Sequence, residues 1–312
     1  MLDIHALNVF LEAARTENFS EAGRHLNLSQ PAVSMQIRSL ENYLQVELFE
    51  RDGRSIRLTK AGQSLVPMAQ QIIQLTVDTE DRIRAANGRV VGNLAIGCST
   101  ASGKYILPHL VARFQRQHPD VRVQIPVVSP GGVVRRVSRG DYDVGVLTRR
   151  DVSAATLDSR PFFDDRLVLI VPATHAWARR GRIPVEALRE ERFIFREPTA
   201  ACRQIVEAAL DERGIAPDSL NVVMEVGNPE AVAMAVEHGI GVSFSSLLAA
   251  VPRLSLGRLA RVEVEGLELV NPIELVTCCT RPASSVQQAF LEFIERAASR
   301  ALIASLASGH GG

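Results

Sequence analysis

Residues 28–41 read LSQPAVSMQIRSLE, and this stretch decides the fold of the N-terminal part of the chain. Its apolar side chains recur at the spacing of a helix, about 100° per residue, so it predicts a helix with one buried side. Ser29 is a good N-cap for this helix, and Pro31 is tolerated in the first turn. The buried side holds Val33, Ile37, Leu40 and Leu44, and the opposite side holds Pro31, Ser34, Met35 and Arg38.

Two further helices are expected before this one. Apolar residues between positions 4 and 14 have helical spacing, and Ser20 is a suitable N-cap for a short helix over residues 21–26. Two short helices joined by a turn at Asn27-Leu28, the second with polar and basic residues near its start, are typical of a helix-turn-helix that reads the major groove. An ordinary three-helix unit with a polar outer side has the same periodicity, so the helices alone leave both interpretations open.

The residue types on the outer side suit the edges of base pairs. A glutamine amide can bond to an adenine edge, an arginine to a guanine or a phosphate, and a methionine can contact a thymine methyl group. The candidates for these contacts are Gln30 or Gln36, Arg38 and Met35.

A basic segment follows the third helix. Residues 51–60, RDGRSIRLTK, carry four basic side chains and the single acid Asp52, and residues 52–53 predict a hairpin turn between short strands. A basic hairpin directly after a reading helix predicts a wing that contacts phosphates or the minor groove. The position of this basic hairpin directly after the helix favours DNA contact over the alternative, a solvated turn.

Residues 17–62, ENFSEAGRHLNLSQPAVSMQIRSLENYLQVELFERDGRSIRLTKAG, resemble the N-terminal winged helix-turn-helix of LysR-type transcriptional regulators. The resemblance implies that Gln30, Pro31, Ser34 and Met35 face the groove and that Arg54 on the wing contacts DNA. Many members have Arg or Lys where this chain has Met35, so a charged contact is missing there. The variant Ser34-Met35-Gln36 resembles members that control carbon-dioxide fixation or sulfur and nitrogen assimilation.

A long helix is expected after the wing. Thr59 can cap it, and Pro67 should bend or strain it locally. Its apolar positions follow a spacing close to a heptad, which predicts a partner helix; they are Ala61, Leu65, Met68, Ile72, Leu75, Thr79 and Ile83. In the resembling family this is the linker helix, which dimerises antiparallel and brings two reading heads to one dyad-related site.

From Gly92 onward, strands alternate with helices, which predicts an α/β domain with a mainly parallel sheet. Strands are expected at residues 94–96, 121–125, 143–147, 167–171, 193–195, 222–224 and 273–276. The resemblance implies a two-lobed, periplasmic-binding-protein-like effector domain. The predicted organisation is a winged helix-turn-helix over 1–60, a linker helix over 61–88 and an effector domain over 89–312, with lobe I at about 91–162 and 268–312 and lobe II at about 163–267.

Hydroxyl side chains and glycines follow several of the expected strands. In such sheets, ligands bind beyond the carboxyl ends of the strands, near helix N-termini. Helix capping explains each of these loops by itself, whereas their convergence on one cleft is implied by the resemblance. The predicted effector contacts are Ser99, Thr100, Ser102, Ser129 and Thr199, with Arg196 and Lys104 as charge partners for an anionic effector. Arg196 can instead pair with Glu197 or Glu225 and be structural.

Cys202 lies close to where peroxide-sensing members of the family carry their reactive cysteine. A thiol near a helix N-terminus and beside Arg203 can have a lowered pKa, which would make the protein a redox-responsive regulator. The alternative is an inert, buried thiol, which is how most free cysteines behave.

Composition narrows the remaining functions. Lys+Arg and Asp+Glu number 35 each, so net charge by itself predicts no nucleic-acid partner, and the four cysteines form no zinc or disulfide pattern. Common nucleotide-binding, hydrolase and metalloprotease motifs are missing, so we expect no enzyme, cofactor or metal. With no apolar span and no signal peptide, we expect a cytoplasmic protein. The expected partners are promoter DNA, a small anionic effector, further copies of the chain in a dimer or tetramer, and RNA polymerase. A ligand-independent DNA-binding protein is the remaining alternative.

Overall fold

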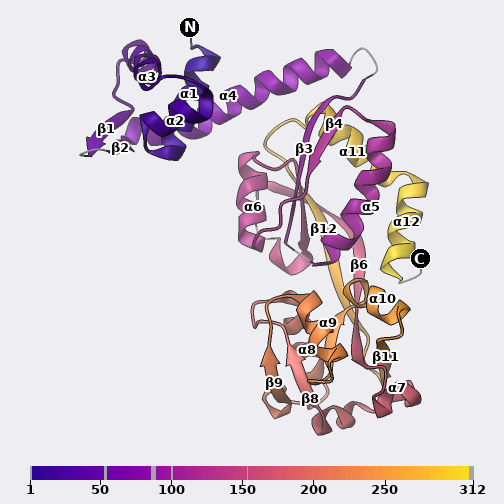
Figure 1. The fold of residues 1–312 in the computed structure, drawn as a ribbon. Helices are drawn as coiled ribbons and strands as arrows, with labels where there is room; N and C mark the ends of the chain where they lie inside the picture. Colours follow the sequence, from indigo (N-terminus) through magenta and orange to yellow (C-terminus); the bar gives the residue numbers. More distant parts are fainter. Residues whose placement is uncertain (1, 53–54, 86–88, 100, 153, 309–312) are drawn as a thin grey trace. The chain divides into compact units, whose positions relative to one another are not determined.

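The computed structural model describes residues 2–52, 55–85, 89–99, 101–152 and 154–308. The chain forms two compact units, Met1–Arg89 and Val90–Gly312, and each is described by itself (Figure 1). Among the described residues, no helix combines the length and the apolar character that crossing a bilayer requires.

The first unit contains the expected helices and hairpin. Helices α1 (Ile4–Thr16), α2 (Phe19–Leu26) and α3 (Gln30–Leu44) are followed by the antiparallel strands β1 (Phe49–Asp52) and β2 (Ser55–Leu58) and by helix α4 (Lys60–Ala85). The predicted buried side of α3 is confirmed, since Val33, Ile37 and Leu40 lie in the core and Leu44 packs against it. The residues between β1 and β2, including Arg54, lie outside the described part of the chain.

The predicted cap of α2 is wrong, whereas the other two caps are confirmed. Helix α2 begins two residues earlier than expected, and the Asn18 side chain, not Ser20, accepts hydrogen bonds from the amides of residues 20 and 21 at 2.9 and 3.1 Å. Ser29 Oγ accepts from Ala32 N at 3.3 Å at the start of α3. Thr59 Oγ1 accepts from Gly62 N at 3.1 Å at the start of α4. Asparagine and serine stabilise a helix start about equally well as N-caps, so residue type alone could not show whether α2 begins after Asn18 or after Ser20.

Helix α4 continues through Pro67, and part of its apolar stripe is exposed. Leu65 and Ile72 pack against the core of the first unit. Met68, Leu75 and Ile83 are 59%, 59% and 67% exposed. Within the first unit, these three side chains therefore remain largely solvent-facing.

The second unit is built on a mixed sheet of eight strands. Its strand order is β4-β3-β5-β12-β6-β11-β7, and β10 also pairs with β6. These strands are β3 (Gly92–Cys98), β4 (Val121–Gln124), β5 (Val144–Thr148), β6 (Leu157–Pro172), β7 (Arg182–Ile183), β10 (Ser243–Ser246), β11 (Leu259–Val264) and β12 (Leu269–Cys278). A separate parallel pair consists of β8 (Arg192–Phe195) and β9 (Asn221–Glu225).

The expectation of a mainly parallel sheet is wrong. Strand β3 runs parallel to β4 and β5, but β12 runs antiparallel to both β5 and β6. Strand β6, which has 16 residues, also pairs antiparallel with β10 and β11, so antiparallel pairs dominate around it. Only its apolar half, residues 167–171, was recognisable, because the other half, LDSRPFFDDR, is rich in charged residues and does not alternate.

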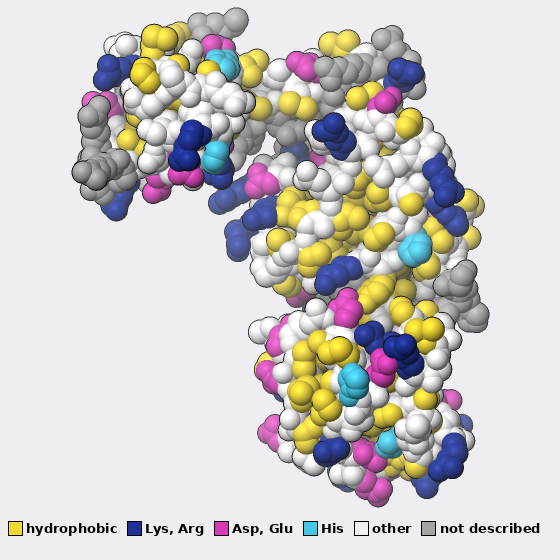
Figure 2. Space-filling model, viewed as in Figure 1, with side chains coloured by type: hydrophobic (Ala, Val, Ile, Leu, Met, Phe, Trp, Pro, Cys, Tyr) yellow, Lys and Arg dark blue, Asp and Glu magenta, His cyan; other side chains and the backbone are white. Residues whose placement is uncertain are grey.

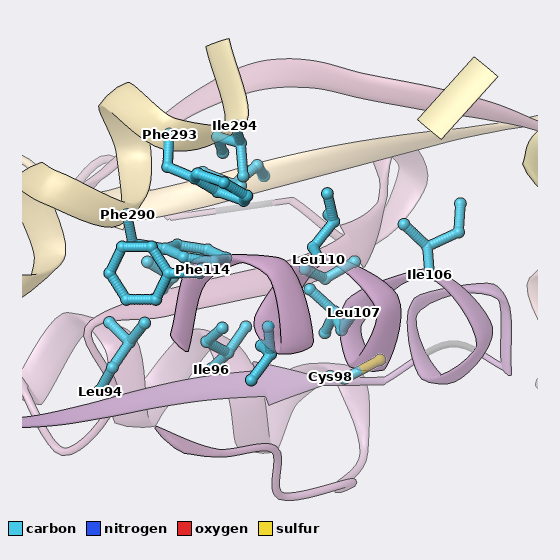
Figure 3. Close-up of a cluster of buried hydrophobic side chains, with 14 of the residues drawn as sticks. Leu94, Ile96, Cys98, Ile106, Leu107, Leu110, Phe114, Phe290, Phe293 and Ile294 are labelled. Atoms are coloured by element: carbon cyan, nitrogen blue, oxygen red, sulfur yellow. The ribbon is translucent and has the colours of Figure 1, made fainter. Parts of the chain in front are cut away.

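Two hydrophobic cores define two lobes in this unit. In lobe I, Phe114 packs between Phe290 and Phe293, with ring centroids 5.3 and 5.5 Å away, over the β3 side chains of Leu94 and Ile96 (Figure 3). Lobe II has its own core around Phe193 and further residues of β8, β10 and β11. Strands β6 and β12 contribute side chains to both cores, so they connect the lobes.

Helices cover both lobes. Lobe I carries α5 (Ala101–Gln117), α6 (Pro130–Arg139), α11 (Ser285–Glu295) and α12 (Ala297–Ala307). Lobe II carries α7 (Ala176–Arg180), α8 (Ala201–Asp211), α9 (Pro229–Glu237) and α10 (Leu247–Ser255).

Candidate nucleic-acid and effector sites

The outer side of α3 forms one shallow hollow. It is lined by Gln30, Pro31, Ser34, Met35, Arg38, Ser39 and Asn42. Five of the six predicted DNA contacts are therefore brought together, and Arg54 is outside the described residues. Ser39 and Asn42 were missed, although Asn42 continues the helical spacing of Met35 and Arg38 and was recognisable from it.

The chemistry of this hollow suits DNA. None of the lining side chains is acidic, and Met35 is 65% exposed at the centre of the surface. Amide and hydroxyl groups can pair with base edges, and Arg38 can approach a guanine or a phosphate without an opposing carboxylate in the hollow. On the face drawn in Figure 2, basic and acidic side chains are interspersed over the protein, as its net charge of zero implies. Local arrangement, not net charge, therefore makes this side of α3 suitable for DNA.

A second site lies between the two lobes of the second unit. It is a cleft of about 580 Å³, within the range of about 300–1,000 Å³ typical of small-molecule sites. Ser99, Ser129, Arg196 and Thr199 line it, together with Lys104. Thr100 and the side chain of Ser102 lie outside what the structure describes.

Three side chains of the cleft have buried polar atoms without a hydrogen-bond partner among the described residues. They are Ser99 Oγ, Ser245 Oγ and Asn271 Oδ1. Folded proteins satisfy the large majority of such atoms, because an unpaired buried polar group costs about 1–3 kcal/mol. Three of them around one cleft indicate a place where a bound molecule supplies the missing partners.

The register of the sheet assembles the floor of the cleft. Asn271 on β12 lies opposite Asp165 on β6, and Asp165 is 2% exposed. Strand β10 pairs with β6 on its other side, and Ser246 Oγ donates to Asp165 Oδ1 at 2.7 Å. Ser246 belongs to residues 239–246, a segment that the sequence marks as a candidate wall of the site. Asp165 and Asn271 were not recognised in the sequence, because they come from two strands whose pairing is not apparent locally.

Helix capping explains some of the loops around the cleft but not others. Ser129 occupies the N-cap position of α6, yet its side chain makes no capping hydrogen bond. Ala200, not Thr199, is the N-cap of α8. Asn228 does cap α9, accepting from the amides of Glu230 and Ala231 at 2.8 and 3.2 Å. The hydroxyls of Ser129 and Thr199 are therefore not used as caps, and ligand contact remains their predicted role.

Several helices begin at the cleft. Pro130, Ala201 and Pro229, the first residues of α6, α8 and α9, all line it, as does Ser246, the N-cap of α10. The first turn of a helix has free amides and the positive end of the helix dipole. The starts of α6, α8 and α10 have no side-chain cap, so they favour negative charge nearby, whereas the carboxylates of Asp151, Asp165 and Glu197 line other parts of the cleft.

The basic side chains of the cleft have different roles. The Arg196 guanidinium donates from Nε and Nη2 to the two carboxylate oxygens of Glu197, each at 2.8 Å. Arg203, rather than Arg196, reaches Glu225, at 2.7 Å. Arg196 therefore enters the cleft already paired, which leaves Lys104 as the cleft cation for which the structure gives no carboxylate contact among the described residues.

Cys202 lines the cleft as a poor nucleophile. Burial raises the pKa of its thiol, and the attraction of nearby Arg196 only partly offsets this effect. A raised pKa leaves little thiolate at neutral pH, and thiolate is the reactive form. Its surroundings therefore favour the inert alternative.

Comparisons with known proteins match both units of the chain. Residues 4–63 match the model of the bacterial regulatory helix-turn-helix protein, lysR family, and residues 87–299 match that of the LysR substrate binding domain. A "Probable RuBisCO transcriptional regulator" from Cyanidioschyzon merolae is 32% identical over 92% of this chain and 95% of its own length. One of the same name from Synechocystis is 31% identical over 91% of this chain and 83% of its own length.

Solved structures share the fold at low sequence identity. Full-length OxyR from Pseudomonas aeruginosa aligns with a TM-score of 0.69 at 21% identity, covering 98% of this chain and 95% of that one. CbnR in complex with its target DNA aligns with a TM-score of 0.65 at 22% identity, covering 95% and 99%. The two family matches together cover nearly all of the chain, which therefore belongs to the LysR family of DNA-binding transcriptional regulators with an effector-binding domain.

Proposed function

We propose that this protein binds promoter DNA through the outer side of α3 and changes transcription when a small anion with hydroxyl groups binds in the inter-lobe cleft. The observation that carries the proposal is the set of unpartnered buried polar atoms, Ser99 Oγ, Ser245 Oγ and Asn271 Oδ1, in a cleft where helices begin. It acts in the cytoplasm by binding, without catalysis, and its effect on RNA polymerase follows from its position on the promoter.

The relatives suggest which genes it controls. Those at about 30% identity over nearly the whole chain carry the name RuBisCO transcriptional regulator. We infer a promoter of carbon-dioxide fixation genes as its target.

The polar groups of the cleft define the chemistry of the effector. An anionic group is favoured near Ser99, Ser129 and Lys104, beside the first turn of α6. Asn271 Oδ1 is an acceptor, so the other end of the effector must donate a hydrogen bond to it. Sugar phosphates and hydroxy acids have both features.

The exposed stripe of α4 supports self-association. Met68, Leu75 and Ile83 are largely exposed at a near-heptad spacing, which suits a second copy of the same helix. A symmetric dimer would present two α3 helices to a dyad-related site, and two dimers would form the expected tetramer. The effector acts as a switch only if it binds one arrangement of the assembly more tightly than another.

Two single variants of the full-length protein test whether α3 recognises DNA and the cleft binds the effector. A binding site is first selected from a random DNA pool, and footprints are then compared with and without a panel of sugar phosphates and hydroxy acids. Gln30→Ala should lose preference for the selected site but keep the thermal shift caused by the active compound. Ser99→Ala should keep the footprint but require about tenfold more of the compound. A footprint that no compound in a broad metabolite panel alters would instead support the ligand-independent alternative.

A further inference from the structure

A second cavity lies in lobe I, away from the inter-lobe cleft. Its volume is about 340 Å³, and it shares no lining residue with the cleft. It is formed by the first half of β6, by Leu275 of β12, and by the C-terminal helices α11 and α12. The volume is at the lower end of the range of about 300–1,000 Å³ for small-molecule sites.

One wall of this cavity has an unsatisfied cation. Arg160 Nη1 lies 3.3 Å from Glu295 Oε1, but Arg160 Nη2 is buried and has no hydrogen-bond partner among the described residues. Glu295 is also paired with Arg300, so one carboxylate serves two guanidinium groups. The three groups together carry a net charge of +1, and guanidinium favours bidentate contact with a carboxylate.

The rest of the cavity is mainly apolar, apart from Ser308 and from Asp164 and Arg166, whose opposite charges leave the net charge of the lining at +1. Phe162 and Phe163 line it with ring centroids 5.1 Å apart, and Leu275, Ile294 and Ile303 close it with 1%, 4% and 6% of their surface exposed. A cavity that combines an apolar wall with a convergent, unsatisfied cation suits a ligand with an apolar body and a single negative group.

We propose that this cavity is a second ligand site, which binds a small amphipathic carboxylic acid. The carboxylate accepts hydrogen bonds from Arg160, including from the unpartnered Nη2, and the aromatic or aliphatic body packs against Phe162, Phe163 and Ile303. The ligand differs in kind from the hydroxylated anion proposed for the cleft, because this cavity buries apolar surface where the cleft offers hydrogen bonds. The proposal does not depend on the identity of the cleft effector.

The test uses the full-length protein and 3-phenylpropionate as the probe. Titration calorimetry and thermal shift should show saturable binding to the wild type. The neutral isostere 3-phenylpropanamide should bind at least about tenfold more weakly, because it cannot neutralise Arg160. Equal binding of acid and amide, or no saturable binding of the acid, would overturn the proposal.

Variants locate the bound acid. Arg160→Gln should weaken 3-phenylpropionate binding by about tenfold or more. Ala304→Phe on α12 fills the cavity without changing any charge, so it should weaken binding even if Arg160→Gln folds poorly. Ser99→Ala, which alters only the cleft, should leave the affinity for 3-phenylpropionate unchanged. Loss of binding in Ser99→Ala with retention in Ala304→Phe would place the acid in the cleft and refute a second site.

Discussion

The phenolic hydroxyl of Tyr105 on α5 donates a hydrogen bond to Glu230 Oε1 on α9 at 2.9 Å, and this bond joins lobe I to lobe II. The bond lies beside the cleft, because Lys104, which precedes Tyr105, and Pro229, which precedes Glu230, both line the cleft. The second carboxylate oxygen, Glu230 Oε2, is buried without a partner among the described residues. The spacing of the lobes and the state of this bond are therefore coupled.

Tyr105→Phe should destabilise the protein. The substitution removes the donor to Glu230 Oε1. The loss should lower the free energy of unfolding by about 1–3 kcal/mol. Urea unfolding measures the effect, with Tyr43→Phe as the matched control, because Tyr43 is 56% exposed. Equal midpoints for the two variants would contradict a structural role for the bond.

The same bond predicts a dependence on alkaline pH. Burial raises the pKa of Tyr105 above its usual value of 10.0, and the hydrogen bond to Glu230 raises it further. Because the unfolded state ionises first, the stability from this group is complete below pH 10 and is lost as the pH rises above it. The difference in unfolding free energy between wild type and Tyr105→Phe should therefore shrink between pH 9 and pH 11 (about one unit on either side of the usual tyrosine pKa).

Removing an unpartnered hydroxyl from the cleft should lower the affinity for the effector without lowering the stability of the ligand-free protein. Ser99→Ala and Ser245→Ala delete buried oxygens that have no partner among the described residues, so the ligand-free protein should keep or gain up to about 1 kcal/mol of stability. Affinity for the effector should fall by about five- to thirtyfold. Thermal melts with and without the effector measure both quantities. A clear loss of stability in the ligand-free variants would mean that these hydroxyls serve the fold.

Acid should weaken the interaction of Glu12 on α1 with His25 on α2 and with Arg15. The hydrogen bond from Arg15 lowers the pKa of Glu12 to about 2, and His25, at 2.7 Å from Glu12 Oε1, contributes as well. A depressed carboxylate pKa contributes stability that is present above pH 4.5, its usual value, and lost as the pH falls toward 2. Glu12→Gln should therefore lower the melting temperature at pH 6 but leave little difference near pH 2. A constant difference would show that the charge is unimportant.

Met35→Arg should change how the protein depends on salt. The new charge adds a contact on the outer side of α3, so affinity for random DNA should rise and the slope of log K against log salt should steepen by about one. Preference for the selected site should fall, because the apolar contact of Met35 is lost. Val77→Arg, which also puts a positive charge at an exposed apolar side chain of the first unit but lies outside both the α3 hollow and the α4 stripe, is the control. A similar slope in both variants would argue against Met35 as a groove contact.

Leu75→Glu should weaken self-association. Leu75 is 59% exposed on the apolar stripe of α4, and placing like charges on both helices of a pair removes apolar burial and adds repulsion. Sedimentation equilibrium should show an increase in the dissociation constant of about tenfold or more. Gln70→Glu adds the same charge to α4 on the side opposite the stripe and should have a much smaller effect. Unchanged association of Leu75→Glu would remove the stripe from the interface.

The sequence by itself determined the reading helix. Val33, Ile37 and Leu40 recur at the helical period, and that period depends only on neighbours in the chain, so both the buried side of α3 and its polar outer side were recognisable. The strands that precede Ser99 and Ser129 were recognisable for the same reason, but β3 ends at Cys98 rather than at residue 96.

Only the tertiary structure decided the floor of the cleft and the second cavity. Asp165 and Asn271 lie opposite each other because of the register between β6 and β12, strands more than a hundred positions apart in the chain. Arg160 approaches Glu295 only because α11 packs near the charged half of β6. Register and packing depend on contacts between distant segments, and no local period records them.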